Sequence, residues 1–471
     1  MGKLSRFKIK VSARLREIGG ALKENDTDYT EIKLSKALWL LAIPMVLEMI
    51  MESVFAVVDI FFVSRLGANA IATVGLTESL LTIIYAIAFG LSMATTAMVS
   101  RRIGEKERGQ AVNTAFQSIL TGILVSICIA IPGAIYAKEL LQLMGASDEI
   151  VNEMSGYTTI MLASNVVIML LFIINAVFRS AGDASIAMRV LWLGNLINLV
   201  LDPILIFGFG PIPAFGVQGA AMATTTGRGI AVLYQFYVLF NGHGRIQLHL
   251  KQMIPDFRVI AQLIRLSVGG IGQNIIATSS WIALMRIVSI FGSEVLAAYT
   301  IAIRIIIFVL LPSWGLSNAA ATLVGQNLGA GKPERAEKAV YAAGKINIVL
   351  LGLIGLIFIL IPGPFIGLFT NNKDILINGS NALQIVSFGF IFYGFGMVLM
   401  NAINGAGDTT TPVKINFLAF WLVEIPMAYL LAIHLGWEEK GVFYAILIGE
   451  SFLCLMAYWW FRQGKWKLKH V

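Results

Sequence analysis

The sequence predicts an all-α integral membrane protein of twelve transmembrane helices, in two parallel six-helix bundles related by a pseudo-twofold axis along the membrane normal. Three observations predict this fold: the composition, twelve long apolar segments and an internal repeat. Of 471 residues, 57% are hydrophobic and 13% are charged, and the mean hydropathy is +0.80. Soluble proteins carry roughly 25% charged residues, so this composition excludes a disordered chain and argues against a soluble enzyme.

Twelve apolar segments are long enough to cross a bilayer, which takes about 20 residues in a helix. They are 37–63, 71–98, 111–136, 157–178, 187–209, 217–240, 262–290, 296–324, 338–369, 382–404, 411–434 and 441–461. The first segment is too long for the apolar core of a signal peptide, so we expect no cleavable signal peptide.

The distribution of basic residues predicts the orientation. Of the 35 Lys and Arg residues, 27 lie before the first segment, in the even-numbered loops or in the tail, and only four lie in the odd-numbered loops. The positive-inside rule then predicts a multi-pass protein of the cytoplasmic membrane with both termini in the cytoplasm. The net charge of +8 therefore needs no nucleic-acid partner.

The spans divide the chain into two predicted lobes. The predicted parts are a basic cytoplasmic segment 1–36, a first lobe 37–240, a cytoplasmic linker 241–258, a second lobe 259–461 and a cytoplasmic tail 462–471. Residues 1–24 carry basic and apolar side chains, which suit either a helix on anionic lipid or a flexible positive tail.

An internal repeat relates the two lobes. A shift of 225 residues places Gly90-Leu91-Ser92 on Gly315-Leu316-Ser317 and Ala181-Gly182-Asp183 on Ala406-Gly407-Asp408, without a gap. Each repeat holds six spans, so the second begins on the same side of the membrane as the first. Parallel repeats of this kind are a transporter architecture, which predicts a substrate site between the lobes and alternating access.

Acidic residues inside the spans are the sharpest functional markers, because a charge at the bilayer centre costs about 2.5–3.5 kcal/mol. Glu48, Glu52 and Asp59 share one face of the first predicted helix, since they are four and seven residues apart. Three carboxylates in an apolar interior require a proton or a cationic partner. A position of Glu48 at the lipid interface is the structural alternative.

The fifth span carries a second polar face. Asn195, Asn198 and Asp202 follow the spacing i, i+3 and i+7, and Pro203 loosens the backbone beside them. Carboxylate, amide and carbonyl oxygens are the ligands that small hard cations prefer, although the Asn residues could merely bond neighbouring helices. Thr224 in the sixth span adds a weak signal.

The second lobe differs at the matching positions, where Leu284 replaces Asp59 and Met427 replaces Asp202. Its mid-span acid is Glu424, so we expect ion coupling mainly in the first lobe. Arg228, inside the sixth span, has no obvious partner in the sequence.

No nucleotide or cofactor motif is found. Gly331-Lys332 resembles the end of a phosphate loop, but Gln326 stands at its first glycine and Pro333 at its Ser/Thr position. The two cysteines and four histidines show no metal-binding spacing. We therefore expect no resident cofactor, no enzyme activity and no ATP, with energy supplied by a gradient of Na⁺ or H⁺.

Several short stretches occur in an order that is typical of one family. They are Ala42-Ile43-Pro44, Val58-Asp59, Arg65-Leu66-Gly67, Phe178-Arg179, Gly182-Asp183, Asp202-Pro203, Gly219-Ala220-Ala221-Met222-Ala223-Thr224, Gly325-Gln326-Asn327-Leu328-Gly329-Ala330-Gly331 and Asn404-Gly405-Ala406-Gly407-Asp408. On these stretches the chain resembles the multidrug and toxic compound extrusion (MATE) transporters over nearly its whole length.

The resemblance implies two six-helix bundles around a central cavity and export of organic cations and other drugs in exchange for Na⁺ or H⁺. By position it implies that Asp59 and Asp202, supported by Asn198 and Thr224, bind the coupling cation, and that these four residues are the Na⁺ ligands if sodium is used. The second lobe lacks the acids on helices 7 and 10 that some members use.

Two acidic positions depart from the family pattern. Glu52 stands where many relatives are polar, and Glu48 is also unusual. Together they could favour proton coupling or act as counter-charges for a cationic substrate. Asn195 and Glu424 are further accessory candidates.

The expected function is a multidrug efflux antiporter whose partners are small drug-like molecules and membrane lipids. Two alternatives stay open: a flippase for lipid-linked oligosaccharides from the same superfamily, and a passive channel or receptor. The oligomeric state is not encoded in any of these patterns.

Overall fold

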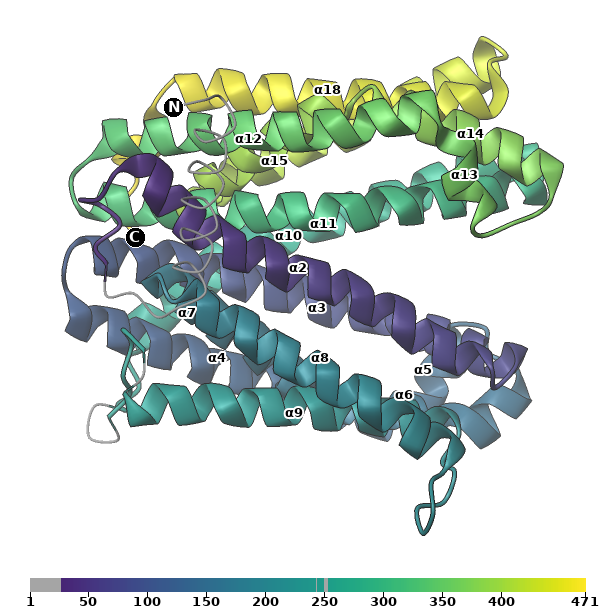
Figure 1. The fold of residues 1–471 in the computed structure, drawn as a ribbon, viewed down its shortest axis with the longest axis horizontal. Helices are drawn as coiled ribbons and strands as arrows, with labels where there is room; N and C mark the ends of the chain where they lie inside the picture. The colour runs from purple at the N-terminus through teal and green to yellow at the C-terminus, as the bar shows by residue number, and fades with distance from the viewer. Residues whose placement is uncertain (1–26, 243, 250–252) are drawn as a thin grey trace, which may run out of the picture. The chain divides into compact units, whose positions relative to one another are not determined.

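A computed structural model describes residues 27–242, 244–249 and 253–471, and it confirms the all-helical fold class (Figure 1). Within these residues the only β-type pairing is an isolated bridge between Phe209 and Ile212. The surface helix or tail predicted for residues 1–24 lies outside the described residues.

The helices form two compact units. The first unit contains Trp39–Ser267, and the second contains Tyr29–Leu38 and Val268–Val471. The chain passes between the units inside two long helices, α2 (Leu34–Ser64) and α10 (Phe257–Val288). The second crossing is therefore C-terminal to the predicted linker 241–258.

The helices of the first unit follow the predicted spans. After α2 come α3 (Ala68–Gly104), α4 (Arg108–Ile135), α5 (Ala137–Leu143), the π-helix η1 (Ile150–Met154), α6 (Ser155–Ala163), α7 (Asn165–Ala181), α8 (Ala184–Phe207) and α9 (Val217–Asn241). The predicted span 157–178 corresponds to α6 and α7, which meet at Ser164 and form part of one 32-residue span, Ile150–Ala181.

The second unit repeats this order with more interruptions. Its elements are α10, the short 3₁₀ turn η3 (Ser289–Phe291), α11 (Ser293–Gly329), α12 (Pro333–Leu360), α13 (Pro362–Gly367), α14 (Lys373–Ser387), α15 (Phe390–Gly405), α16 (Thr410–Asn416), η4 (Phe417–Glu424), α17 (Ile425–Tyr429), η5 (Leu430–His434), α18 (Glu438–Arg462) and η6 (Lys465–Leu468).

Two predicted spans of this unit are not single straight helices. The span 338–369 ends at Leu360, because Pro362 cannot continue the helix and disfavours a helical conformation in the residue before it. The span 382–404 corresponds to α14 and α15, which are bent by 55° relative to each other.

The 225-residue repeat is visible in the backbone at matched positions. Gly182 (φ 101°) ends α7, and the N–H of Asp183 bonds the carbonyl of Phe178 at 2.8 Å. Gly407 (φ 91°) ends α15, and the N–H of Asp408 bonds the carbonyl of Ile403 at 3.1 Å. Both glycines adopt the left-handed conformation that a helix end of this type requires. These turns support the repeat, and the pseudo-twofold axis stays a prediction.

Nine helices in the described part of the chain are long and apolar enough to cross a membrane, or ten when the bent pair α14–α15 counts as one span. The two other predicted spans coincide with α2 and α9, which are helices of 31 and 25 residues. The protein is thus a multi-pass membrane protein, and the count of twelve spans stays a prediction.

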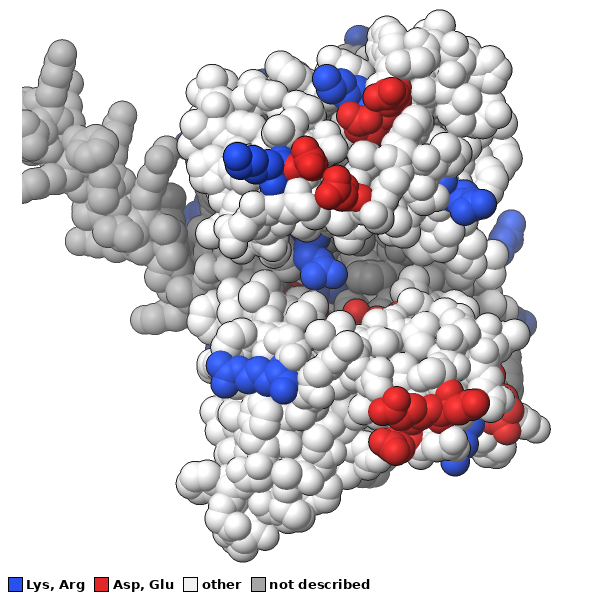
Figure 2. All heavy atoms as spheres, turned by 90° about the vertical axis from the view of Figure 1, so that its right-hand side faces the viewer, with Lys and Arg blue, Asp and Glu red and all other residues white. Residues whose placement is uncertain are grey.

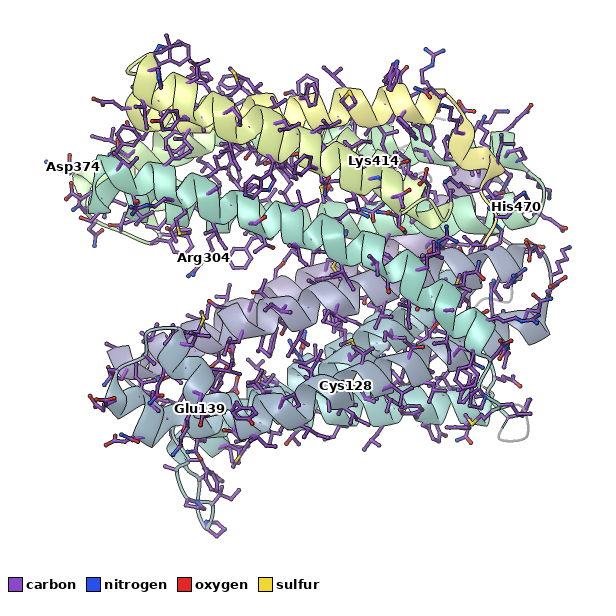
Figure 3. The ribbon with its side chains drawn as sticks, turned by 180° about the vertical axis from the view of Figure 1, so that it is seen from behind. Cys128, Glu139, Arg304, Asp374, Lys414 and His470 are labelled. Carbon is purple, nitrogen blue, oxygen red and sulfur yellow. The ribbon has the colours of Figure 1, made fainter. Side chains whose placement is uncertain are left out.

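Within each unit the two sets of loops lie at opposite ends. In the second unit Asp374, at the start of α14, lies at the far end from His470, and in the first unit Glu139 on α5 marks the end with the odd-numbered loops (Figure 3). Figure 2 shows that the surface near α5 and α13 is mostly uncharged, with small groups of acidic and basic side chains. This matches the low number of basic residues in the odd-numbered loops.

Candidate functional site

Asp202, Asn198 and Thr224 meet where α8 packs against α9. The amide nitrogen of Asn198 donates to Oδ1 of Asp202 at 3.3 Å and to Oγ1 of Thr224 at 3.1 Å. All three side chains are buried, and Asp202 is 0% exposed. The other carboxylate oxygen of Asp202, Oδ2, is buried and has no hydrogen-bond partner among the described residues.

The two helices approach each other closely because they meet at glycines. A Cβ on Gly227 would lie 2.6 Å from the carbonyl oxygen of Gly194 and 3.1 Å from the backbone nitrogen of Asn198. Only a residue without a side chain fits there, and the close approach brings Thr224, one turn earlier on α9, within reach of Asn198 on α8.

Replacing Gly227 by alanine is expected to separate the helices and to lower stability by about 1–3 kcal/mol, the usual effect of overpacking. The measurement is the thermal unfolding midpoint of the purified protein in detergent. Gly229→Ala is the matched control on the same helix, because nothing lies within 4 Å of its Cβ position. Equal midpoints for the two variants would contradict this account of the helix contact.

Asp59 lies on α2 and is half-buried. Its Oδ1 atom is buried and has no hydrogen-bond partner among the described residues. The charged groups that act on its carboxylate are Glu78 and Arg228, and Asp59 in turn acts on Asp202. The structure therefore places Asp59 in the electrostatic range of the Asn198–Asp202–Thr224 cluster.

Glu48, on the same face of α2, has a different environment. Its Oε1 accepts hydrogen bonds from Nη1 of Arg179 at 2.7 Å and from Nδ2 of Asn175 at 3.2 Å, both on α7. The Glu48 and Arg179 side chains are 2% and 12% exposed. Gln235 supports the network through a 2.8 Å hydrogen bond to Asn175. Glu48 is thus buried with a cation already beside it.

Glu52, one turn further along α2, is also paired. Its Oε1 lies 3.6 Å from Nη2 of Arg228, and its Oε2 accepts a 3.4 Å hydrogen bond from Asn195. Arg228 is buried, and its guanidinium also donates to the hydroxyl of Tyr85 at 3.1 Å. Asn195 therefore contacts Glu52.

The three acids of α2 contact or act on residues of α7, α8 and α9. Sequence reasoning did not assign Arg179 and Arg228 as partners. Arg179 lies one residue beyond the predicted span 157–178, where a basic side chain needs no buried partner. Arg228 carried a signal, since a buried cation requires an anion, but the sequence did not show which one.

Glu424 lies in the second unit and takes no part in this cluster. Among the described residues, no group of three or more His, Cys, Asp and Glu side chains is placed to hold a metal. The cluster of Asp59, Asp202, Asn198 and Thr224 is instead a small set of oxygen donors in which two carboxylate oxygens lack partners. Such a set suits a proton or a monovalent cation.

A family model described as MatE matches the chain twice, over residues 44–204 and 271–430. The two matches together cover more than half of the chain. Each half matches the same model on its own, as expected for an internal repeat.

Curated relatives are similar over nearly their full length. The probable multidrug resistance protein NorM of Thermotoga maritima is 24% identical over 444 residues, which cover 93% of this chain and 94% of the relative. The multidrug export protein MepA of Staphylococcus aureus is 23% identical, with 90% and 92% covered. A FAD transporter of Shewanella oneidensis is 25% identical, with 86% and 89% covered.

Solved structures show the same fold. A MOP superfamily transporter from Pyrococcus furiosus has a TM-score of 0.88 and 25% identity, covering 95% of this chain and 100% of its own. The outward-facing conformation of a multidrug resistance MATE family transporter has a TM-score of 0.88, 26% identity and the same coverage.

Proposed function

Because the chain belongs to the MatE family of transporters, we propose that it is a secondary active efflux antiporter of the cytoplasmic membrane. It exchanges cytoplasmic organic compounds, mainly cationic ones, for external Na⁺ or H⁺ by alternating access. Both termini are cytoplasmic, and the lobes 37–240 and 259–461 are joined by the linker 241–258. Relatives named as multidrug resistance or export proteins support this assignment.

One observation carries the proposal: the acids of the first unit fall into two classes. Glu48 and Glu52 each have an arginine within ion-pair distance. Asp59 and Asp202 form no ion pair among the described residues, and Asp59 acts electrostatically on Asp202. Each has a buried carboxylate oxygen without a hydrogen-bond partner, as Glu48 also does at its Oε2 atom. A cation that enters from outside would provide the missing positive charge for Asp59 and Asp202.

The coupling follows from this arrangement. Asp59 and Asp202 bind Na⁺ or a proton, and Asn198 and Thr224 orient Asp202 and supply further oxygen atoms. Binding of the cation removes negative charge near the helix face of α2, which weakens the attraction for a cationic substrate. Exchange results when the cation and the substrate favour different states of the protein, because a ligand shifts an equilibrium only through its differential affinity.

The paired acids then have structural or tuning roles. Glu48 and Arg179 tie α2 to α7, and Glu52 and Arg228 tie α2 to α9. A role of Glu48 or Glu52 as a counter-charge for the substrate would require the substrate to displace an arginine, which makes this role the weaker proposal.

Ethidium efflux from proteoliposomes tests the function, with Na⁺ and H⁺ gradients imposed separately. The proposal expects efflux that follows one gradient and stops when the gradient is collapsed. Equal fluxes with and without gradients would indicate a passive pathway. FAD belongs in the panel as an anionic compound, because one relative is named as its transporter, and a lipid-linked oligosaccharide tests the flippase alternative.

A further inference from the structure

Glu424 is buried in the second unit and has no counter-charge among the described residues. It is the last residue of the π-helix η4, its side chain is 2% exposed, and its Oε2 atom has no hydrogen-bond partner among the described residues. The carboxylate faces α18 at Gly449, where a Cβ would lie 2.6 Å from Oε2. π-helical turns are rare and occur often at functional sites.

A second acid stands next to this contact. Glu450 follows Gly449 on α18 and acts electrostatically on Glu424. Tyr393 on α15 interacts with the Glu450 carboxylate. The other titratable groups facing the pair are Tyr299 on α11, which interacts with Glu424, and Cys454 on α18, which interacts with Glu450.

In the part of the chain that the structure describes, these two acids have no positively charged partner. No Lys, Arg or His forms an ion pair with Glu424 or Glu450 in the described ranges, and the arginines of the nearby spans, Arg286 and Arg304, are exposed. A buried Glu424 beside the partly buried Glu450 is unfavourable when both are charged, so the pair must hold at least one proton. A metal ion would need more oxygen donors than two carboxylates and a phenol supply.

The internal repeat gives this pair a defined place in the fold. The shift of 225 residues places Gly449 on Thr224 and Glu450 on Thr225, and it places Glu424 on Leu199, one turn before Asp202. The carboxyl pair therefore occupies the same helix crossing in the second repeat that the Asn198–Asp202–Thr224 cluster occupies in the first.

We propose that Glu424 and Glu450, with Tyr393, form a second proton-binding site, which takes up and releases one proton in each transport cycle. Its role in the cycle rests on the proposed antiport function, whereas proton binding at the pair does not. The alternative is a carboxylic acid that stays protonated throughout and only packs α18 against η4.

The first test is infrared difference spectroscopy of the full-length protein in lipid during a pH titration. We expect a protonated-carboxyl band that disappears as the pH rises, that is lost in Glu424→Gln and that persists in the double variant Asp59→Asn, Asp202→Asn. Glu438→Gln, at the exposed start of α18, is the matched control and should retain the band. If Glu424→Gln does not fold, the same loss is expected in Glu450→Gln, and Tyr393→Phe should shift the band.

The second test counts protons moved per ethidium in proteoliposomes with a pH-sensitive dye. Glutamine resembles a protonated acid in shape, so a permanently protonated Glu424 would tolerate the substitution without any change in the count. The proposal expects one proton fewer per ethidium in Glu424→Gln. An unchanged count with an unchanged band would overturn it. If the wild type shows no coupled transport, the antiport proposal is wrong. The infrared result would still test proton binding at Glu424 and Glu450 on its own.

Discussion

Replacing Asp202 by asparagine is expected to abolish ion-driven ethidium efflux while the protein still folds. Asparagine preserves the shape of the side chain but cannot carry the negative charge that a cation or proton neutralises. Allosteric coupling between two ligands typically amounts to about 5–150-fold in affinity, and we expect the driven flux to fall by about 100-fold. The measurement is initial efflux from proteoliposomes under the gradient that drives the wild type.

Asp59→Asn should give the same loss, because its carboxylate has the second unpartnered oxygen of the pair. Asp148→Asn, in an exposed loop of the first unit, is the matched control and should retain full flux. If Asp59→Asn or Asp202→Asn shows normal exchange, the substituted residue is not part of the coupling site.

The second large effect is expected at Arg179, because its removal leaves Glu48 buried without a cation. Glu48 is 2% exposed, and its ion pair with Arg179 measures 2.7 Å. Breaking a buried pair at one partner usually destabilises a protein by about 3–5 kcal/mol. Arg179→Gln should therefore unfold at a clearly lower temperature in detergent, and the double variant Glu48→Gln, Arg179→Gln should recover much of the loss.

Arg102 provides the matched comparison. It pairs with Glu105 at 2.8 Å, but the two side chains are 25% and 30% exposed. Pairs at the surface contribute about 0–1 kcal/mol, so Arg102→Gln should change the unfolding midpoint little. If Arg179→Gln changes the unfolding midpoint as little as Arg102→Gln does, the ion pair between α2 and α7 does not stabilise the first unit.

The spacing of residues in the sequence predicts which side chains share a face of a single helix. The spacing of Glu48, Glu52 and Asp59 predicts that they share one face of α2. The spacing of Asn198 and Asp202 predicts that they are neighbours on one helix face, and the structure contains a 3.3 Å hydrogen bond between them. Helix periodicity decides both features. The family resemblance added Thr224, whose contact with Asn198 the structure contains.

Contacts between distant segments could not be predicted in this way. Arg179 and Glu48 are 131 residues apart in sequence, and only the packing of α7 against α2 brings them together. Glu450 was missed because the second lobe was compared with the first at matched positions only. There Leu284 and Met427 stand in place of the acids, whereas Glu424 lies one turn before Met427 and has its partner on α18.

The most direct test of the account measures ethidium binding to the purified protein in lipid nanodiscs by fluorescence polarisation, across a series of Na⁺ concentrations and pH values. Linkage requires that an ion imported in exchange for a drug also weakens drug binding at equilibrium. The account predicts that Na⁺ or H⁺ lowers the ethidium affinity at least about fivefold and that the dependence disappears in Asp202→Asn. Wild-type affinity that is independent of both ions would contradict cation-coupled antiport at Asp59 and Asp202.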